Sequence, residues 1–149
     1  MIELFSRTNY LLQEENGLTP IHIDDSVSSL SAILLNDAYY QALMDGREIM
    51  RGISVLKPEW IIPFKAKAWL DLREKKDVDS SDIKKHRNDI IRIVSDMFLQ
   101  KCILPDEVRR DMEKFIEQFD VTESELKNLK IRGTKPEDIK RVLQTTYLD

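Results

Sequence analysis

Cysteine is nearly absent from this sequence, and long apolar runs are absent altogether. Cys102 is the single cysteine, so no disulfide forms within the chain, and its apolar neighbours predict a small buried side chain. No stretch approaches the roughly 20 apolar residues that a membrane span requires, and the N-terminus lacks the basic and apolar segments of a signal peptide. We therefore expect a cytoplasmic protein with no membrane contact.

An excess of one charge is also lacking. The 149 residues include 23 basic and 27 acidic side chains, for a net charge of −4. Such a mixture has no overall attraction to a phosphate backbone, so a nucleic-acid partner would need a local basic patch. The chain length and its 42% hydrophobic content predict one domain, residues 1–149, with a true core.

The apolar patterns predict an α+β fold, with a β-containing half over residues 1–57. We expect short strands at 1–5, 21–23 and 28–35, followed by a short helix that ends at Gly46. Residues 48–56 are expected to form either a tight strand pair that turns at Arg51-Gly52 or one bent strand. These strands would form a small antiparallel or mixed sheet packed by helices.

Residues 58–149 are predicted to form a helical half. The first helix spans 58–74, and we expect Ile61, Phe64, Ala68 and Leu72 to face the sheet because they recur at helical spacing. A second helix spans about 80–98, with Met97 and Phe98 on its apolar stripe. A third starts at Pro105-Asp106, a brief helical turn follows Thr122, and a terminal helix opens near Pro136.

Two motifs in the middle of the chain resemble those of a known family. Lys65-Ala66-Lys67-Ala68-Trp69, with Arg73 close behind, follows a strand that ends in Val55-Leu56. Lys85-His86-Arg87-Asn88-Asp89-Ile90-Ile91 comes next. In this order they resemble the C-terminal part of nucleotidyltransferase-fold proteins of the AbiEii/AbiGii toxin-like family. Ile2-Glu3-Leu4 is similar to a strand of that family, so the likeness covers roughly residues 1–98.

The resemblance implies roles for specific residues. Glu3 would be the family's third metal-binding carboxylate, and Glu3, Lys65 and Asp89 would be its catalytic residues. Phosphate or nucleotide binding would fall to Lys65, Lys67, Arg73 and Lys85. Nucleotidyl transfer uses Mg²⁺ to bridge phosphate oxygens, so an active protein would need Mg²⁺, and the implied partners are a nucleotide or tRNA.

The first two catalytic carboxylates of that family lie in an Asp-x-Asp motif that follows a Gly-Ser pair, and this sequence lacks that combination. Its four glycines are followed by Leu, Arg, Ile and Thr, and its one Asp-x-Asp, Asp77-Val78-Asp79, falls between two predicted helices, where we interpret it as a solvated linker. We therefore expect a chain that is inactive alone and at most binds nucleotide or RNA. Activity would need a partner chain that supplies the missing half, or a reading frame that begins upstream of Met1.

Each of these residues also has an ordinary structural interpretation. Lysine stems routinely cover apolar surface on helices, Glu3 fits a solvated strand position, and Asp89 fits a modest surface pair with Lys85. Trp60 and Trp69 are predicted to be core residues. The basic residues Lys84, Lys85, Arg87 and Arg92 are interleaved with aspartates, which favours a solvated face of mixed charge.

A second functional hypothesis needs no catalysis. A strand at Met1–Phe5 and the apolar segment around Cys102 would suit a protein-interaction module that forms a homo- or hetero-oligomer, because an open strand edge invites pairing.

Overall fold

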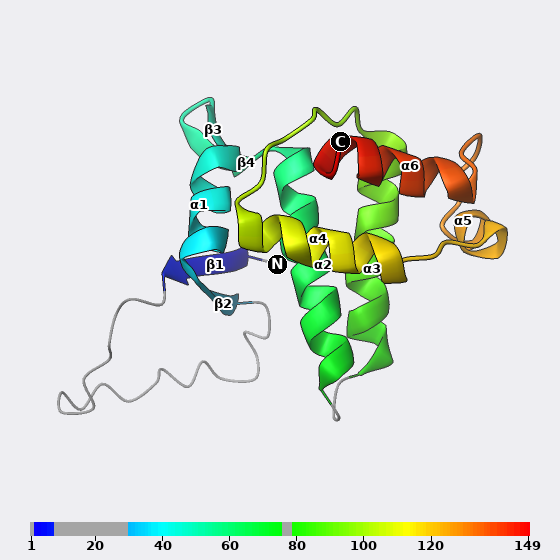
Figure 1. Ribbon diagram of the computed structural model, residues 1–149, viewed down its shortest axis with the longest axis horizontal. Coiled ribbons are helices and arrows are strands. Elements are labelled where there is room, and N and C mark those ends of the chain that lie inside the picture. The colour runs from blue at the N-terminus through cyan, green and yellow to red at the C-terminus, as the bar shows by residue number, and fades with distance from the viewer. Residues whose placement is uncertain (1, 8–29, 76–78) are drawn as a thin grey trace.

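The computed structural model describes residues 2–7, 30–75 and 79–149, and side chains from Asn36 onward within those ranges. Its elements, shown in Figure 1, are β1 (Ile2–Arg7), β2 (Leu30–Leu35), α1 (Asp37–Gly46), β3 (Arg47–Met50), β4 (Ile53–Leu56), α2 (Pro58–Glu74), α3 (Ser80–Asp96), α4 (Asp106–Gln118), α5 (Glu123–Asn128) and α6 (Pro136–Tyr147). The α+β class is confirmed. The strand expected at 21–23 lies outside the described residues.

The described strands form two separate pairs. β1 and β2 run parallel, from Ile2 opposite Leu30 to Arg7 opposite Leu35. β3 and β4 form an antiparallel hairpin that turns at Arg51 and Gly52, both with positive φ (52° and 79°), as a type I′ turn requires. The predicted turn position is confirmed. The parallel and antiparallel pairings occur in different two-stranded sheets instead of one mixed sheet.

In the described residues, helices make the main contacts with the buried face of α2. Its main packing partners are α3, α4 and α1, and in Figure 1 α4 crosses the α2–α3 pair. The buried face carries Ile62, Ala66, Trp69 and Leu70. The predicted stripe of Ile61, Phe64, Ala68 and Leu72 is only half-buried. That prediction was wrong because apolar side chains surround much of α2, so periodicity alone could not select the face that meets the core.

The core lies where α2, α3, α4 and α6 meet. Both tryptophans are buried, as predicted, and the Trp69 ring contacts the Phe115 ring edge-on at a centroid distance of 5.3 Å. The apolar spacing after Pro105-Asp106 also predicts a stripe of Val108, Met112, Phe115, Ile116 and Phe119 on one face of the third helix, and all five side chains are buried. Such perpendicular aromatic contacts add to the free energy already gained by apolar burial.

The segment that follows α3 differs from its prediction. The helix ends at Asp96, which leaves Met97 exposed and Phe98 91% exposed. Cys102 is buried as expected, and its backbone N–H donates to the carbonyl of Thr146. Burial raises the pKa of the Cys102 thiol to about 12, so the sulfur stays protonated at neutral pH. Among the helices of the described ranges, none has the length and apolar content to span a membrane.

Candidate functional site

Two of the predicted site residues meet across the α2–α3 packing. The ammonium of Lys65 on α2 lies 2.8 Å from Oδ2 of Asp89 on α3. Both side chains are partly shielded from water, with exposed fractions of 20% and 33%. The two helices run antiparallel and form the most extensive helix pair of the fold, and this packing brings the second turn of α2 level with the middle of α3.

A hollow of about 340 Å³ opens beside Asp89 on the outer face of α3. We call it the α3 hollow; its lining residues are Ser81, Lys84, Lys85, Asn88, Asp89 and Arg92. They recur every three or four positions, so they share one face of the helix. Lys85, which the sequence predicted to bind phosphate, therefore lies beside the Lys65–Asp89 pair.

The charge of the α3 hollow is positive. Three of its lining residues are cations, and its one carboxylate, Asp89, is already paired with Lys65. Within the described part of the chain, neither Lys84 nor Arg92 has an ion-pair partner. Cations that lack a protein counter-charge favour an anionic ligand.

The N-terminus of α3 is held by Asp79, the last residue of the Asp-x-Asp sequence. Its Oδ1 accepts a hydrogen bond of 2.9 Å from the backbone N–H of Ser81, as an N-cap does. Hydrogen bonds from the Ser81 backbone and hydroxyl lower the pKa of this exposed carboxyl. Asp79 thus caps α3, which fits its interpretation as part of a linker. Asp77 and Val78 lie outside the described residues.

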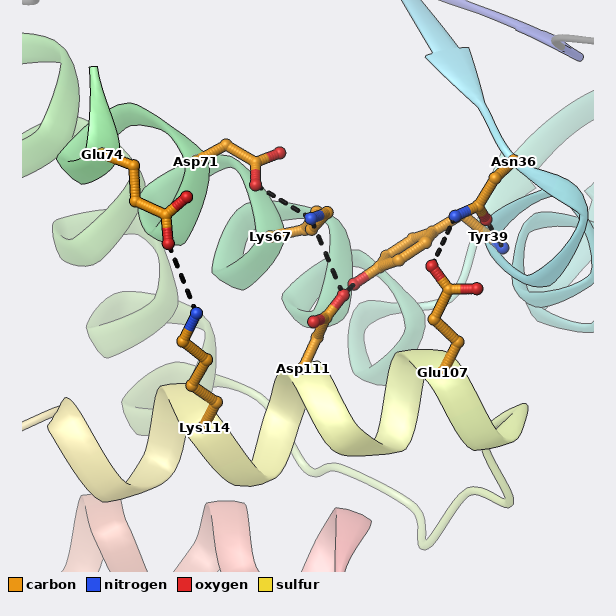
Figure 2. Close-up of polar contacts among 8 residues, drawn as sticks. All are labelled: Asn36, Tyr39, Lys67, Asp71, Glu74, Glu107, Asp111 and Lys114. Atoms are coloured by element: carbon orange, nitrogen blue, oxygen red, sulfur yellow. Dashed lines mark hydrogen bonds and ion pairs between the residues drawn. The ribbon is translucent and has the colours of Figure 1, made fainter.

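Lys67 belongs to a different cluster, between α1, α2 and α4 (Figure 2). Its ammonium lies 2.8 Å from Oδ1 of Asp71 and 3.9 Å from Oδ2 of Asp111. Burial acts to lower the pKa of Lys67, but the hydrogen bond to Asp71 and the charges of Asp111 and Glu107 outweigh it and raise the pKa. The Tyr39 hydroxyl donates to the same Asp111 oxygen at 2.8 Å, so Lys67 and Tyr39 both serve to anchor α4.

Arg73 also lies away from the α3 hollow. Its guanidinium lies over the Trp69 ring, 4.2 Å from the ring centroid, and it donates to the side-chain oxygen of Gln118 at 3.0 Å. The Trp69 contact lies within α2, whereas the Gln118 contact connects α2 to the last residue of α4. The structure therefore divides the predicted phosphate-binding residues: Lys65 and Lys85 lie together, and Lys67 and Arg73 lie elsewhere.

Arg87, which the sequence grouped with the other basic residues of α3, lies on a different face of the helix. It donates to the carbonyl of Asp120 and contacts the carboxylate of Glu125 at 2.9 Å, and its guanidinium covers the Phe119 ring. Desolvation acts to raise the pKa of Glu125, but the Thr122 hydrogen bonds and the Arg87 charge outweigh it and lower the pKa. Arg87 therefore joins α3 to α5. The sequence spacing did not predict this contact, because Arg87 is only three positions from Lys84, which lines the hollow.

Glu3 lies in β1, where its backbone is opposite Ser31 of β2. The described residues contain no group of three histidine, cysteine, aspartate or glutamate side chains that could hold a metal ion. The donor set of the hollow does not suit Mg²⁺, because its one carboxylate is paired with Lys65 and three cations surround it. The metal role of Glu3 stays a prediction.

Two lining residues, Ser81 and Asn88, were not singled out from the sequence. Both residues are separated from Lys84, Lys85 and Arg92 by helical spacing. That spacing was the sequence feature that could have predicted their place on the same helix face. Comparison of the chain with family models, with curated proteins and with solved structures gave no match.

Proposed function

We propose that this chain is a nucleotidyltransferase-like protein of the AbiEii/AbiGii kind that binds a phosphate-bearing ligand, nucleotide or RNA, and does not transfer nucleotide by itself. The observation that supports binding is the α3 hollow, where Lys84, Lys85 and Arg92 gather around the Lys65–Asp89 pair. The lack of a Gly-Ser pair ahead of an Asp-x-Asp motif supports the absence of transfer, because one carboxylate cannot hold the metal ions of this chemistry.

The α3 hollow is long enough for its cations to contact more than one phosphate. Lys84 and Arg92 are separated by eight residues of helix, which is about 12 Å at a rise of about 1.5 Å per residue. Phosphates along one nucleic-acid strand are separated by about 3.4 Å of helix axis. Among the described residues, none that lines the hollow is aromatic, so these side chains offer no surface for base stacking. We therefore expect binding through phosphates, with little preference among bases.

The binding test uses the full chain with three probes: inorganic tripolyphosphate, ATP and tRNA. A variant with Lys84→Glu, Lys85→Glu and Arg92→Glu should bind every probe that the wild type binds at least about tenfold more weakly. For tRNA, the slope of log K against log salt should fall by about 2 to 3, because each lost phosphate contact removes roughly 0.7 to 0.9 from that slope.

The matched control reverses three cations outside the hollow, with Arg110→Glu, Lys127→Glu and Arg132→Glu together. All three residues are exposed, and the control makes the same change of charge. Equal weakening by the control would show that only net charge matters, and it would overturn the assignment of the site. A second assay, nucleotide incorporation into tRNA with labelled triphosphates and Mg²⁺, should show no transfer; robust transfer by the isolated chain would refute the incomplete-site account.

A further inference from the structure

Large hydrophobic side chains are exposed at one end of the molecule. Among the described residues, those that expose a large apolar side chain are Met44, Ile49, Met50, Ile53, Met97, Phe98 and Ile103. They come from the end of α1, the β3–β4 hairpin and the connection between α3 and α4. We call this set the apolar end.

Three contacts show that these segments share one end. Gly46 at the base of the hairpin lies directly against Trp60 in the first turn of α2. The α3–α4 connection is held at Cys102 by the carbonyl of Thr146. The next residue of α6, Tyr147, donates its hydroxyl to the carbonyl of Glu59, again in the first turn of α2. Figure 1 shows the hairpin, this connection and the C-terminus at the same end of the helix bundle.

The β3–β4 hairpin exposes large apolar side chains to solvent. All four residues of β3 are exposed, and Ile49 and Ile53 are 71% and 67% exposed. On the connection, Phe98 and Ile103 are 91% and 89% exposed. A gathered group of large exposed apolar side chains marks a contact surface, whereas single exposed residues are ordinary.

The charges around the apolar end indicate what covers it. Within residues 44–53 and 96–103, the exposed basic and acidic residues are equal in number: Arg47, Arg51 and Lys101 against Asp45, Glu48 and Asp96. A nucleic acid or an anionic membrane would favour an excess of positive charge. A two-fold contact with an identical surface lets the positive groups of one copy face the negative groups of the other.

We propose that the apolar end is the contact surface of a homodimer, in which Ile49, Ile53, Phe98 and Ile103 are buried against a second copy of this chain. The hairpin and the 97–103 connection together approach the roughly 20 to 30 residues that each partner contributes to a stable interface of standard size. This inference is independent of the phosphate-binding function, because the α3 hollow and the apolar end have no residue in common.

The first test is the mass of the full chain in solution, measured by light scattering over a dilution series. We expect twice the 17.5 kDa chain mass at high concentration. Ile49→Glu and, separately, Phe98→Glu should each weaken dimerisation at least about tenfold, because dimerisation would bury the new carboxylate. Ser124→Glu, on the exposed surface of α5, introduces the same charge elsewhere and should leave the dimer intact. A monomer mass at all concentrations overturns the proposal.

The second test examines the charges across the contact. Glu48→Arg in one preparation, and Arg47→Glu with Arg51→Glu in another, should each weaken self-association, whereas a mixture of the two should form a dimer. A mixture that associates no better than either variant alone contradicts the charge pairing. Sedimentation with phosphatidylcholine vesicles, with and without phosphatidylserine, should leave the protein in solution; binding of a monomer to either vesicle would show a membrane surface instead. Circular dichroism confirms that each variant is folded.

Discussion

The ammonium of Lys65 and the carboxylate of Asp89, on neighbouring antiparallel helices, lie 2.8 Å apart at the rim of the α3 hollow. The family resemblance assigned catalytic roles to both residues, and the fold places them in contact. As a partly exposed ion pair it stabilises the fold only modestly, by about 0.2 to 1 kcal/mol. Its larger consequence is electrostatic: Lys65 offsets the one negative charge beside Lys85 and Arg92.

Asp89→Asn should therefore strengthen the binding of tripolyphosphate. The change removes a negative charge from the lining and frees Lys65 to face the ligand. For unit charges about 6 Å apart in a water-like dielectric, the interaction is about 0.7 kcal/mol, so we expect roughly threefold tighter binding by isothermal titration calorimetry. Asp149→Asn, which removes an exposed carboxylate at the C-terminus, should leave the affinity unchanged. Weaker binding by Asp89→Asn would mean that Asp89 contacts the ligand directly.

Gly46→Ala should destabilise the fold by about 1 to 3 kcal/mol, the usual cost of an overpacked site. A Cβ at this position would lie 2.3 Å from Cγ of Trp60 and 2.8 Å from Cδ1 of Leu56, and the buried indole cannot move away. Urea unfolding measures the loss. The comparison variant is Gly52→Ala, which meets no neighbouring atom and carries only the strain of φ 79°, at about 1 kcal/mol. A loss below about 1 kcal/mol for Gly46→Ala would contradict the close packing.

Tyr39→Phe should destabilise the protein by about 1 kcal/mol at neutral pH, because it deletes the hydrogen bond to Asp111. It should also change the pH dependence. Burial, and then the Asp111 carboxylate, raise the pKa of Tyr39 far above its ordinary value of about 10. In the unfolded chain the phenol loses its proton above about pH 10, whereas in the folded chain it does not. Stability therefore falls as pH rises above about 10, and Tyr39→Phe should make that fall shallower.

Asp111→Asn separates the two main causes of the raised Tyr39 pKa, which are burial and the Asp111 carboxylate. It removes the carboxylate charge and keeps both the phenol and its burial, so the alkaline loss of stability should become smaller but persist. Unfolding free energies between about pH 9 and 11 give the comparison. A wild-type and a Tyr39→Phe protein with the same alkaline slope would show that Tyr39 ionises as readily when folded as when unfolded.

Several elements followed from local sequence. The turn at Arg51-Gly52 was predictable because glycine adopts positive φ without strain, and the α4 stripe was predictable because its apolar residues occupy a single face. The face of α2 was not predictable, since a helix that contacts three others has apolar side chains on most sides. The end of α3 was misplaced because Met97 and Phe98 continue the apolar spacing although the helix has already ended.

The sequence by itself determined the α+β class, the helical second half, the buried tryptophans and the lack of a Gly-Ser/Asp-x-Asp motif, because each depends on residues close together in the chain. Only the tertiary structure decided which charged residues share a surface. It joined Lys65 to Asp89 and Lys85, and it placed Lys67, Arg73 and Arg87 within reach of Asp111, Gln118 and Glu125. The physical reason is that a long cationic side chain binds the acceptor that helix packing brings within its reach, and each of these acceptors is distant in sequence from its cation.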